Sequence, residues 1–307
     1  MMFSLENHPG YAILPFYHYK GDFQMPDKIY LWSDCEAVPS SITPFLLPGT
    51  EPRAAVLVIP GGAYGGVCRN TEGIPIAKAF NQLGLHAFVL DYRVAPNRWP
   101  APQQDAIRAM RIIRANAEKW NVIPDRIASC GFSAGGHLAG SLGVLTDLVN
   151  ADNGDSIDGE RGDADGMILC YGVLVFEPWS HVGTYRNLTG EDPELLKLCS
   201  LEKHDLSKAP PAFVWATVTD QLVDYHNSIV FAEAMNAAKR PCELHIYPHG
   251  DHGMLLGLET PDVCAWPSAA VNFLQNEWER RDTGCANANR YTNGYQYEAE
   301  KRAGLTI

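Results

Sequence analysis

A serine between two closely spaced glycines is the feature of this sequence that most directly suggests chemistry. Ser133 lies within Gly131-Phe132-Ser133-Ala134-Gly135-Gly136-His137, which contains the pattern Gly-x-Ser-x-Gly. The apolar residues 126–130 before it are strand-like, and the Ala- and Leu-rich residues 136–146 after it are typical of a helix. Glycines two positions away prevent collisions with the strand and helix at such a turn. The pattern predicts an accessible nucleophilic hydroxyl, although Gly-x-Ser-x-Gly alone also occurs in idle turns.

A nucleophilic serine needs a base that takes its proton and an acid that orients the base. Asp220 directly follows the strand-like run 212–219, and His252 follows the strand-like run 242–247. Both come after Ser133, in the order serine, acid, histidine, where loops at the carboxyl ends of strands would reach back over the serine. We therefore predict Ser133 as the nucleophile, His252 as the base and Asp220 as its orienting acid.

Two alternatives concern the segment around His252. His249 is a second candidate base, but it lies closer to the end of its strand, and Gly253 after His252 suits a tight, exposed loop. His249, Asp251 and His252 are also conceivable metal ligands, yet the further His or Cys cluster that such a site needs is missing from the sequence. We therefore expect neither a metal nor a cofactor.

A glycine-rich loop at residues 60–66 follows the continuous apolar run 54–59, which is typical of a strand buried on both faces. Backbone N–H groups in such a loop can point toward a phosphate or toward the oxyanion of a reaction intermediate. The Lys-Ser/Thr pair that completes a phosphate loop is missing. An oxyanion-binding loop is the preferred interpretation.

Strand-like and helix-like segments alternate along most of the chain, which predicts an α/β fold with a mostly parallel, doubly wound sheet and helices on both faces. The first two strands are expected to lie antiparallel at a sheet edge. The expected strands are 28–32, 42–47, 54–59, 86–92, 126–130, 167–175, 212–219 and 242–247, and the expected helices are 72–83, 106–120, 136–146, 228–238 and 265–278.

The chain is interpreted as one domain over residues 1–307, with a catalytic core at 26–280. Residues 150–165 are acidic and Gly-rich and are expected to form a surface loop that buries very little. Residues 176–211 form a longer irregular segment in the position of a small lid. The polar tail 281–307 could mediate a contact in a homo-oligomer.

Composition limits the classes of partner and the compartment. With 307 residues, 46% of them hydrophobic, the chain can bury a substantial core. A formal net charge of −12 opposes a nucleic-acid or anionic-membrane partner. Eight scattered cysteines without a Cys-x-x-Cys pair, no recognisable secretion signal and no long apolar stretch favour reduced thiols and the cytoplasm. The glycosylation sequon at Asn187-Leu188-Thr189 has meaning only in a secreted protein.

Taken together, the ordered motifs resemble the α/β-hydrolase superfamily and, within it, the acetyl-xylan-esterase-like and hormone-sensitive-lipase-like esterases. The resemblance covers roughly residues 28–278, and it implies the α/β-hydrolase fold with a small lid insertion. The motifs that carry it are Pro60-Gly61-Gly62-Ala63-Tyr64, Asp91-Tyr92-Arg93-Val94-Ala95-Pro96, Gly131 to His137, Asp220-Gln221-Leu222-Val223 and Asp251-His252-Gly253.

The resemblance also assigns roles within these motifs. It implies that His252 acts first as general base and then as general acid for Ser133. It further implies an oxyanion hole formed by the backbone N–H groups of Gly62, Ala63 and Ala134.

The lipase-like branch usually has His-Gly-Gly-Gly in the first motif, whereas Pro60 and Ala63 replace the His and the last Gly here. This departure favours the sugar-esterase branch. The resemblance then implies an acetyl esterase that removes O-acetyl groups from plant-derived, xylan-type oligosaccharides. Tyr64, Trp179 and Tyr185 are candidate substrate-binding residues that could stack on sugar rings, and packing beneath the lid is their alternative role.

Two other functions remain in view. A general small-acyl carboxylesterase without sugar specificity is the nearest one. A binding protein without catalysis is the other, and the complete set of Ser133, Asp220 and His252 argues against it.

Overall fold

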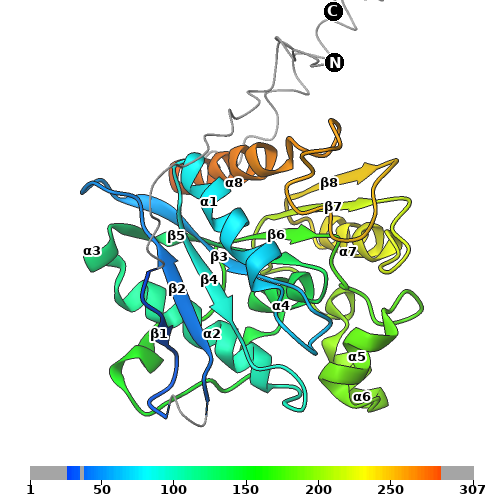
Figure 1. Ribbon diagram of the computed structural model, residues 1–307, viewed down its shortest axis with the longest axis horizontal. Helices are drawn as coiled ribbons and strands as arrows, with labels where there is room; N and C mark the ends of the chain where they lie inside the picture. The colour runs from blue at the N-terminus through cyan, green and yellow to red at the C-terminus, as the bar shows by residue number, and fades with distance from the viewer. Residues whose placement is uncertain (1–25, 35–37, 285–307) are drawn as a thin grey trace, which may run out of the picture.

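Runs of apolar, mostly β-branched and aromatic residues form the strands of one central sheet (Figure 1). The structure is a computed structural model that describes residues 26–34 and 38–284. The strands in this part of the chain are β1 Ile29–Tyr30, β2 Ser41–Phe45, β3 Arg53–Ile59, β4 His86–Asp91, β5 Val122–Phe132, β6 Gly166–Cys170, β7 Ala212–Thr217 and β8 Cys242–Tyr247.

The described strands lie in the order β1-β2-β4-β3-β5-β6-β7-β8. β1 pairs antiparallel with β2, and β2 pairs antiparallel with β4, so both predicted antiparallel strands lie at one edge. All other neighbours are parallel. The structure therefore confirms the predicted mostly parallel α/β sheet.

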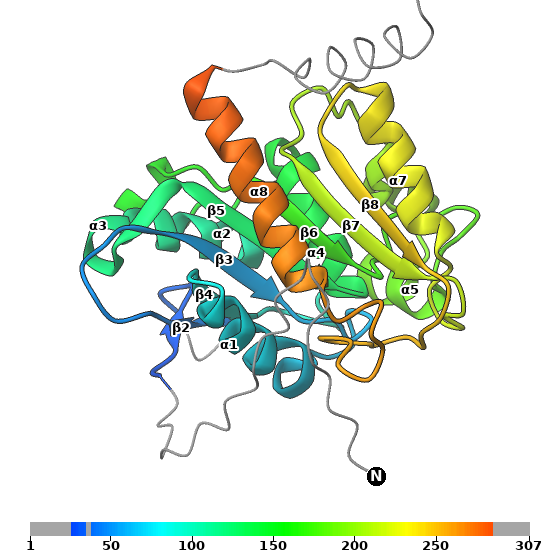
Figure 2. The same cartoon turned by 90° about the horizontal axis from the view of Figure 1, so that it is seen from above.

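Helices cover both faces of this sheet. The helices in the described residues are η1 Arg69–Gly73, α1 Ile74–Gln82, α2 Ala101–Ala115, α3 Ala117–Trp120, α4 Ala134–Val144, η2 Thr146–Leu148, η3 Ser156–Gly159, α5 Val182–Thr189, α6 Pro193–Cys199, η4 Leu201–Lys203, α7 His226–Ala237 and α8 Trp266–Thr283. The hydrophobic contacts place α1 and α8 on one face and α2, α4 and α7 on the other (Figure 2).

The strand β3 shows why its sequence is apolar throughout. Leu57 and Ile59 contact the core under α2 and α4, whereas Val56 and Val58 contact the core under α1 and α8. Successive side chains of a strand point to opposite faces, so a strand covered on both sides needs apolar residues at every position.

The topology places several loops at one edge. The chain leaves β3 toward β4 on one side, and β5 then pairs with β3 on the other side. In doubly wound sheets such a switch opens a crevice at the carboxyl ends of the strands. The glycine-rich loop after β3, the serine turn after β5 and the loops after β7 and β8 all lie at this end.

The predicted acidic loop at 150–165 lies at the surface, as expected, and is anchored by ion pairs. Arg108 of α2 pairs with Asp155, and its Nη1 also lies 3.0 Å from Asp158 Oδ1. Arg114 Nη2, on the same helix, lies 2.9 Å from Asp165 Oδ2, and both side chains are almost fully buried. The prediction that this segment buries very little is confirmed, since only Ala151, Ala164 and Asp165 are buried within 150–165, but ion pairs with α2 attach it firmly despite its lack of apolar residues.

The predicted irregular segment at 176–211 contains the two helices α5 and α6 and the short turn η4. The backbone N–H of Trp99 donates to Leu188 O at 2.9 Å, and the N–H of Leu201 donates to Leu174 O at 3.1 Å. The first bond attaches α5 to the loop before α2, and the second attaches η4 to the chain just after β6.

Other element boundaries shift for local reasons. The predicted helix 106–120 is divided into α2 and α3 at Asn116, whose side chain and backbone N–H groups both donate to Ile112 O. The predicted strand 167–175 ends at Cys170 because Tyr171 has a left-handed φ of 37°. Helix α8 continues to Thr283, into the predicted tail, and residues 285–307 of that tail lie outside the described residues.

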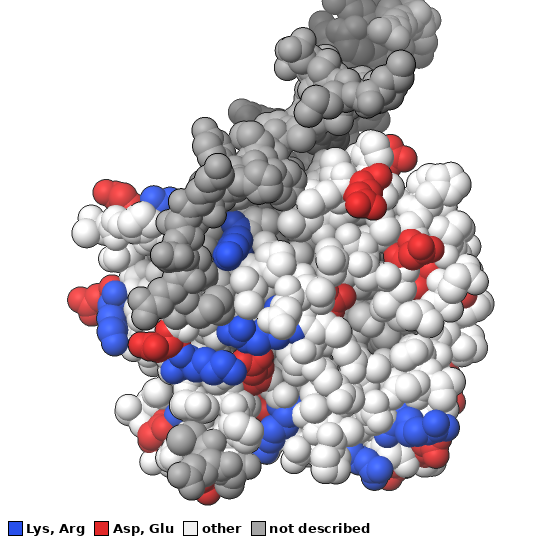
Figure 3. Space-filling model, in the orientation of Figure 1, with Lys and Arg blue, Asp and Glu red and all other residues white. Residues whose placement is uncertain are grey.

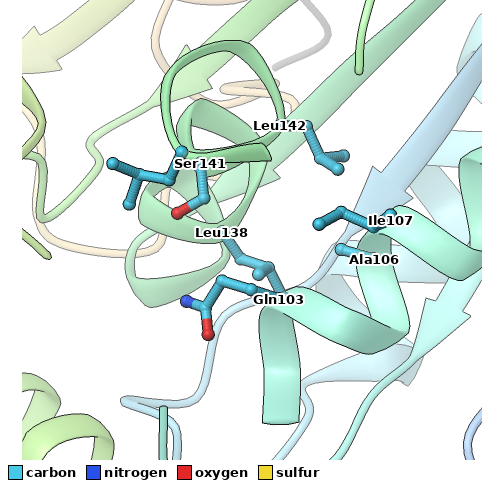
Figure 4. A pocket seen from close by; sticks show the side chains of 7 residues that line it. Gln103, Ala106, Ile107, Leu138, Ser141 and Leu142 are labelled. Carbon is cyan, nitrogen blue, oxygen red and sulfur yellow. The ribbon is translucent and has the colours of Figure 1, made fainter. Parts of the chain in front are cut away.

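A packing gap too small to hold a water molecule lies between α2 and α4 (Figure 4). Ala106, Ile107, Leu138 and Leu142 supply most of its lining, and Gln103 adds an amide. This packing gap lies beneath the helix that follows Ser133.

On the face shown in Figure 3, basic and acidic side chains lie next to one another over β1 and β2. Lys28 Nζ, beside β1, lies 2.8 Å from Asp91 Oδ2 at the end of β4, and Arg69 Nε lies 3.1 Å from the same oxygen.

None of the helices in the described residues is both long enough and apolar enough to cross a membrane.

We expect Asp165→Ala to destabilise the protein by about 3 kcal/mol, because it leaves the guanidinium of Arg114 buried and unpaired. The melting temperature should fall by roughly 5 to 10 °C. Asp163→Ala is the matched control, since Asp163 pairs with Arg161 at the exposed surface. Thermal unfolding followed by circular dichroism measures both, and equal shifts would contradict the buried anchor.

Candidate active site

The turn between β5 and α4 presents Ser133 in a backbone conformation that is strained for a residue with a side chain, with φ 54° and ψ −122°. Its N–H donates to Cys170 O at 3.0 Å, and its carbonyl accepts from the Val173 N–H at 3.1 Å. Both partners belong to the end of β6 and the turn after it. The neighbouring strand therefore holds Ser133 in this conformation.

The two glycines of the motif allow the close packing that this turn requires. A Cβ atom at Gly131 would lie 2.0 Å from Gly135 O, and one at Gly135 would lie 2.2 Å from Ile59 O. Because these contacts are with backbone atoms, no side-chain movement could relieve them. The predicted collisions with the helix and the neighbouring strand are confirmed.

Ser133, His252 and Asp220 lie together in one hydrogen-bonded chain. Ser133 Oγ is 2.9 Å from His252 Nε2, and His252 Nδ1 is 2.7 Å from Asp220 Oδ2. Since a carboxylate accepts, Nδ1 carries the proton that points to Asp220, and the lone pair of Nε2 faces the serine hydroxyl. This arrangement can transfer the serine proton to the imidazole, as nucleophilic catalysis requires.

The environment of Asp220 favours its charged form. Burial alone would raise the pKa of this carboxyl, but hydrogen bonds from His252 and from the N–H groups of Val223 and Leu222 lower it overall. These two N–H groups lie 3.0 and 2.8 Å from Asp220 Oδ1. Asp220 is thereby kept ionised and oriented, with Oδ2 left for the imidazole.

Hydrogen bonds also fix the loop of His252 to the loop of Asp220. Thr217 Oγ1 donates to Gly250 O at 2.8 Å, and the N–H of Gly250 donates to Thr219 Oγ1 at 2.9 Å. The two loops therefore form one unit at the ends of β7 and β8.

The two alternatives for the segment around His252, namely His249 as the base and a metal site, have less geometric support. His249 is exposed, and within the described residues it makes no hydrogen bond to Ser133 or Asp220. Across residues 26–34 and 38–284, no three His, Cys, Asp or Glu side chains are grouped so that they could hold a metal ion.

The glycine-rich loop passes directly beside the serine. A Cβ at Gly61 would lie only 3.0 Å from Ser133 Cβ. In the described part of the chain, the N–H groups of Gly62, Ala63 and Ala134 have no protein acceptor. Such groups beside a nucleophile can stabilise negative charge that develops on a substrate oxygen.

A buried carboxyl that the sequence did not single out supports this loop. Glu72 Oε2 accepts from the Gly61 N–H at 2.7 Å, and Glu72 Oε1 accepts from the hydroxyl of Tyr171 at 2.9 Å. The ring of Tyr171 in turn packs edge-on against His252, with ring centroids 5.1 Å apart. Burial raises the pKa of Glu72, while the Gly61 and Tyr171 hydrogen bonds lower it in part.

The prediction of Tyr64 as a substrate-stacking residue is wrong for this conformation, because its side chain is fully buried. Its hydroxyl lies 2.7 Å from His137 Nδ1, and His137 Nε2 lies 2.7 Å from Cys199 O. A carbonyl can only accept, so Nε2 carries the hydrogen and Nδ1 accepts from the tyrosine. Burial lowers the pKa of His137 to about 4, which keeps the imidazole neutral.

The other two predicted substrate contacts are partly buried. Trp179 stacks on His226, with ring centroids 4.3 Å apart and an interplanar angle of 13°. Both Trp179 and Tyr185 pack against the hydrophobic core. The carbonyl of Trp179 accepts from Asn227 Nδ2 at 2.8 Å, on the helix α7 that follows the loop of Asp220.

Sequence reasoning missed Glu72, Tyr171 and the structural role of His137. His137 has a detectable signal, because it lies one helical turn after Ser133 and faces inward on α4. Glu72 and Tyr171 have none, since they are separated by 99 residues and meet only in the folded protein.

The family model BD-FAE matches residues 47–235, more than half of the chain, a range that includes Ser133 and Asp220 but ends before His252. The chain belongs to the BD-FAE family. This assignment and the relatives below confirm the predicted membership of the acetyl-xylan-esterase-like branch of α/β-hydrolase esterases.

Two curated relatives and one solved structure illustrate this membership. The chain is 38% identical to endo-1,4-beta-xylanase B of Butyrivibrio fibrisolvens over 66% of its length and 32% of the relative. It is 30% identical to an acetylxylan esterase of Xylanibacter ruminicola over 69% of its length and 43% of the relative. The chain thus spans about a third to less than a half of these two curated relatives.

Among solved structures, the acetyl ester-xyloside bifunctional hydrolase from Caldicellulosiruptor lactoaceticus is similar over nearly its whole length. The sequence identity is 34% and the TM-score is 0.75, over 86% of this chain and 98% of that chain. The likeness confirms the α/β-hydrolase fold.

The buried, neutral His137 predicts acid sensitivity. Its folded pKa of about 4 lies below its ordinary value of 6.5, so the unfolded state binds a proton that the folded state rejects as the pH falls between these values. Stability that is present above pH 6.5 should therefore decline by about 3 kcal/mol down to pH 4 from this group alone.

Urea unfolding at several pH values measures this effect. His137→Gln should be less stable than wild type at pH 7.5, yet its stability should fall less steeply between pH 6.5 and 4.5. His204→Gln is the control, because His204 also contacts a carbonyl, Leu198 O, but is only half-buried. Parallel slopes for wild type and His137→Gln would refute the assignment.

Proposed function

We propose that the protein is a serine carboxylic-ester hydrolase that removes O-acetyl groups from plant-derived, xylan-type oligosaccharides through an acyl-enzyme. The observation that carries the proposal is the hydrogen-bonded chain from Ser133 Oγ through His252 to Asp220. Membership of the BD-FAE family supports ester chemistry at this site.

The proposed first step is attack of Ser133 Oγ on the ester carbonyl carbon. The serine proton moves to His252 Nε2, and Asp220 stabilises the imidazolium that forms. The carbonyl oxygen becomes an oxyanion held by the N–H groups of Gly62, Ala63 and Ala134, each worth roughly 3 kcal/mol in the transition state.

Collapse of this intermediate breaks the ester bond and leaves the acyl group on Ser133. His252 returns its proton to the departing sugar oxygen, so the alcohol leaves neutral. Water then attacks the acyl-enzyme while His252 accepts its proton. Collapse of this second intermediate breaks the bond between the acyl carbon and Ser133 Oγ, His252 returns the proton to Oγ, and acetate is released.

The substrate part of the proposal rests on the relatives. One is named an acetylxylan esterase, and the similar solved structure is named an acetyl ester-xyloside bifunctional hydrolase. Within this chain, Trp179 and Tyr185 are the remaining candidates for contacts with sugar rings, and the bond from Asn227 of α7, the helix after the Asp220 loop, to the carbonyl of Trp179 favours Trp179. We also propose a cytoplasmic site of action. The six cysteines in the described residues form no disulfide, which agrees with a reducing compartment.

Release of acetate from acetylated xylo-oligosaccharides tests the reaction and the substrate together. Wild type should prefer p-nitrophenyl acetate to the butyrate and octanoate esters and should deacetylate the oligosaccharides. Ser133→Ala should lower kcat on every ester by about 10⁴-fold or more while keeping the fold, because it removes the nucleophile.

Trp179→Ala separates sugar recognition from ester cleavage in the same assay. It should raise KM for the oligosaccharides and leave p-nitrophenyl acetate nearly unaffected. A broad chain-length profile without sugar deacetylation would identify a general carboxylesterase instead, and activity that survives Ser133→Ala would mean a different nucleophile or none.

The choice of base has its own test. His252→Ala should reduce kcat by about 10⁴-fold or more, because no other group accepts the serine proton. His249→Ala, three positions earlier on the same loop, should retain activity close to wild type. Steady-state kinetics with p-nitrophenyl acetate compares them, and the reverse pattern would assign the base to His249.

A further inference from the structure

The glycine-rich loop is held by hydrogen bonds to four successive carbonyl groups. Three of them accept from backbone N–H groups, either a few residues later in the chain or at Ala95, whereas the carbonyl of Ala63 accepts from a side chain that is 124 residues away in the sequence. The donors are Cys68 N–H for Gly61 O at 2.9 Å, Gly65 N–H and Gly66 N–H for Gly62 O at 2.9 and 3.1 Å, Asn187 Nδ2 for Ala63 O at 2.9 Å, and Ala95 N–H for Tyr64 O at 2.7 Å.

The Ala63 carbonyl lies at the most strained point of this loop. Ala63 and Tyr64 both have left-handed backbones, with φ of 53° and 54°. Two consecutive residues with side chains rarely adopt this conformation unless surrounding contacts enforce it. The N–H and the carbonyl of Ala63 belong to two consecutive peptide groups that meet at the Ala63 Cα. Because Asn187 holds the carbonyl, the orientation of the Ala63 N–H is restricted as well.

Asn187 is brought to this position by helix α5, within the segment 176–211. The N–H of Trp99 donates to Leu188 O, so the backbone next to Asn187 is fixed independently of its side chain. The absence of a side chain at Gly65 leaves room for the amide, since a Cβ there would lie 3.0 Å from Asn187 Nδ2. The loop and the helix are thus complementary at this contact.

A second contact joins the same two regions. The hydroxyl of Tyr64 bonds to His137, which donates to the carbonyl of Cys199 at the end of α6. The segment 176–211 therefore contacts the glycine-rich loop through both of its helices, directly at Ala63 and through His137 at Tyr64.

We propose that Asn187 is a positioning residue for the oxyanion loop, and that the segment 176–211 builds the oxyanion site in addition to covering it. The amide of Asn187 holds the peptide after Ala63, which keeps the Ala63 N–H directed at the developing oxyanion. This inference rests on the proposed ester hydrolysis. It gives a structural role to an asparagine that the sequence marks only as part of a glycosylation sequon.

Steady-state kinetics of Asn187→Ala on p-nitrophenyl acetate tests the proposal. We expect kcat to fall between about 5- and 50-fold, less than the loss of a whole oxyanion donor, with KM changed by less than about twofold. The pH at half-maximal kcat/KM should stay at its wild-type value, because Asn187 does not touch Ser133, His252 or Asp220. Asn187→Asp should lose more, since its carboxylate would face the Ala63 carbonyl without a donor.

Two controls separate positioning from unfolding and from substrate contact. Titration of active sites by the p-nitrophenol burst counts competent enzyme, and kcat is expressed per titrated site. Arg186→Ala, on the same helix, removes an exposed pair with Glu191 and should retain wild-type kinetics. The substrate is p-nitrophenyl acetate because its small acetyl group gives the segment 176–211 little to contact.

A double-mutant cycle gives a sharper test. Gly65→Ala should lower kcat by displacing the Asn187 amide, but it should have little further effect in the Asn187→Ala background, where the amide is absent. Additive losses would show that Gly65 acts independently of Asn187 and would overturn the proposal.

Two other outcomes would also overturn it: a wild-type kcat for Asn187→Ala, or a rise in KM with kcat unchanged. Either result leaves the proposed esterase intact as long as Ser133→Ala is inactive. Activity in Ser133→Ala would instead contradict the proposed function itself.

Discussion

The strained backbone of Ser133 is the constraint on which the rest of the site depends. A φ of 54° with ψ of −122° is unfavourable for a residue with a side chain, at a cost of order 1 to 3 kcal/mol. It persists because the end of β6 and the turn after it hold the peptide groups on either side and because Gly131 and Gly135 permit backbone contacts that any Cβ would prevent. The conformation lifts the hydroxyl out of the sheet edge, toward the loops after β7 and β8. Asp220 and His252 can meet the serine only because these loops end at the same edge.

The buried ionisable groups around this turn have separate electrostatic roles. Asp220 is kept ionised by backbone and imidazole donors, so it can orient His252. His137, one helical turn after Ser133, is kept neutral by burial and serves as a hydrogen-bonded link. Glu72 binds a backbone N–H of the glycine-rich loop and the hydroxyl of Tyr171, which packs on His252. Polar groups in the interior thus connect the nucleophile turn, the glycine-rich loop and the base.

The segment 176–211 is more closely integrated with the site than a simple cover would be. Asn227, fully buried on α7, accepts from the N–H of Val175 and donates to the carbonyl of Trp179. One side chain thereby fixes the entry to the segment next to the loop that contains Asp220. With the contacts from Asn187 and His137, the segment is attached at its start, middle and end. Loops that are attached at several points are less free to open, which favours a preformed site.

The sequence by itself determined the α/β alternation, the antiparallel edge and the positions of Ser133, Asp220 and His252 after the strands β5, β7 and β8. These features are local, since each depends on hydrophobic periodicity, on turn residues or on the order of motifs along the chain. The surface location of the acidic segment 150–165 followed from its composition, but its ion pairs did not, because its partners, arginines of α2, are distant in sequence. Tyr64 was mispredicted because an aromatic residue beside a proposed site carries no sign of whether it faces substrate or core. Only the tertiary structure decided that Tyr64 is buried against His137 and that Glu72 contacts Tyr171. The same holds for the contact of Asn187 with Ala63, because contacts between separated polar residues leave no periodicity or spacing in the sequence.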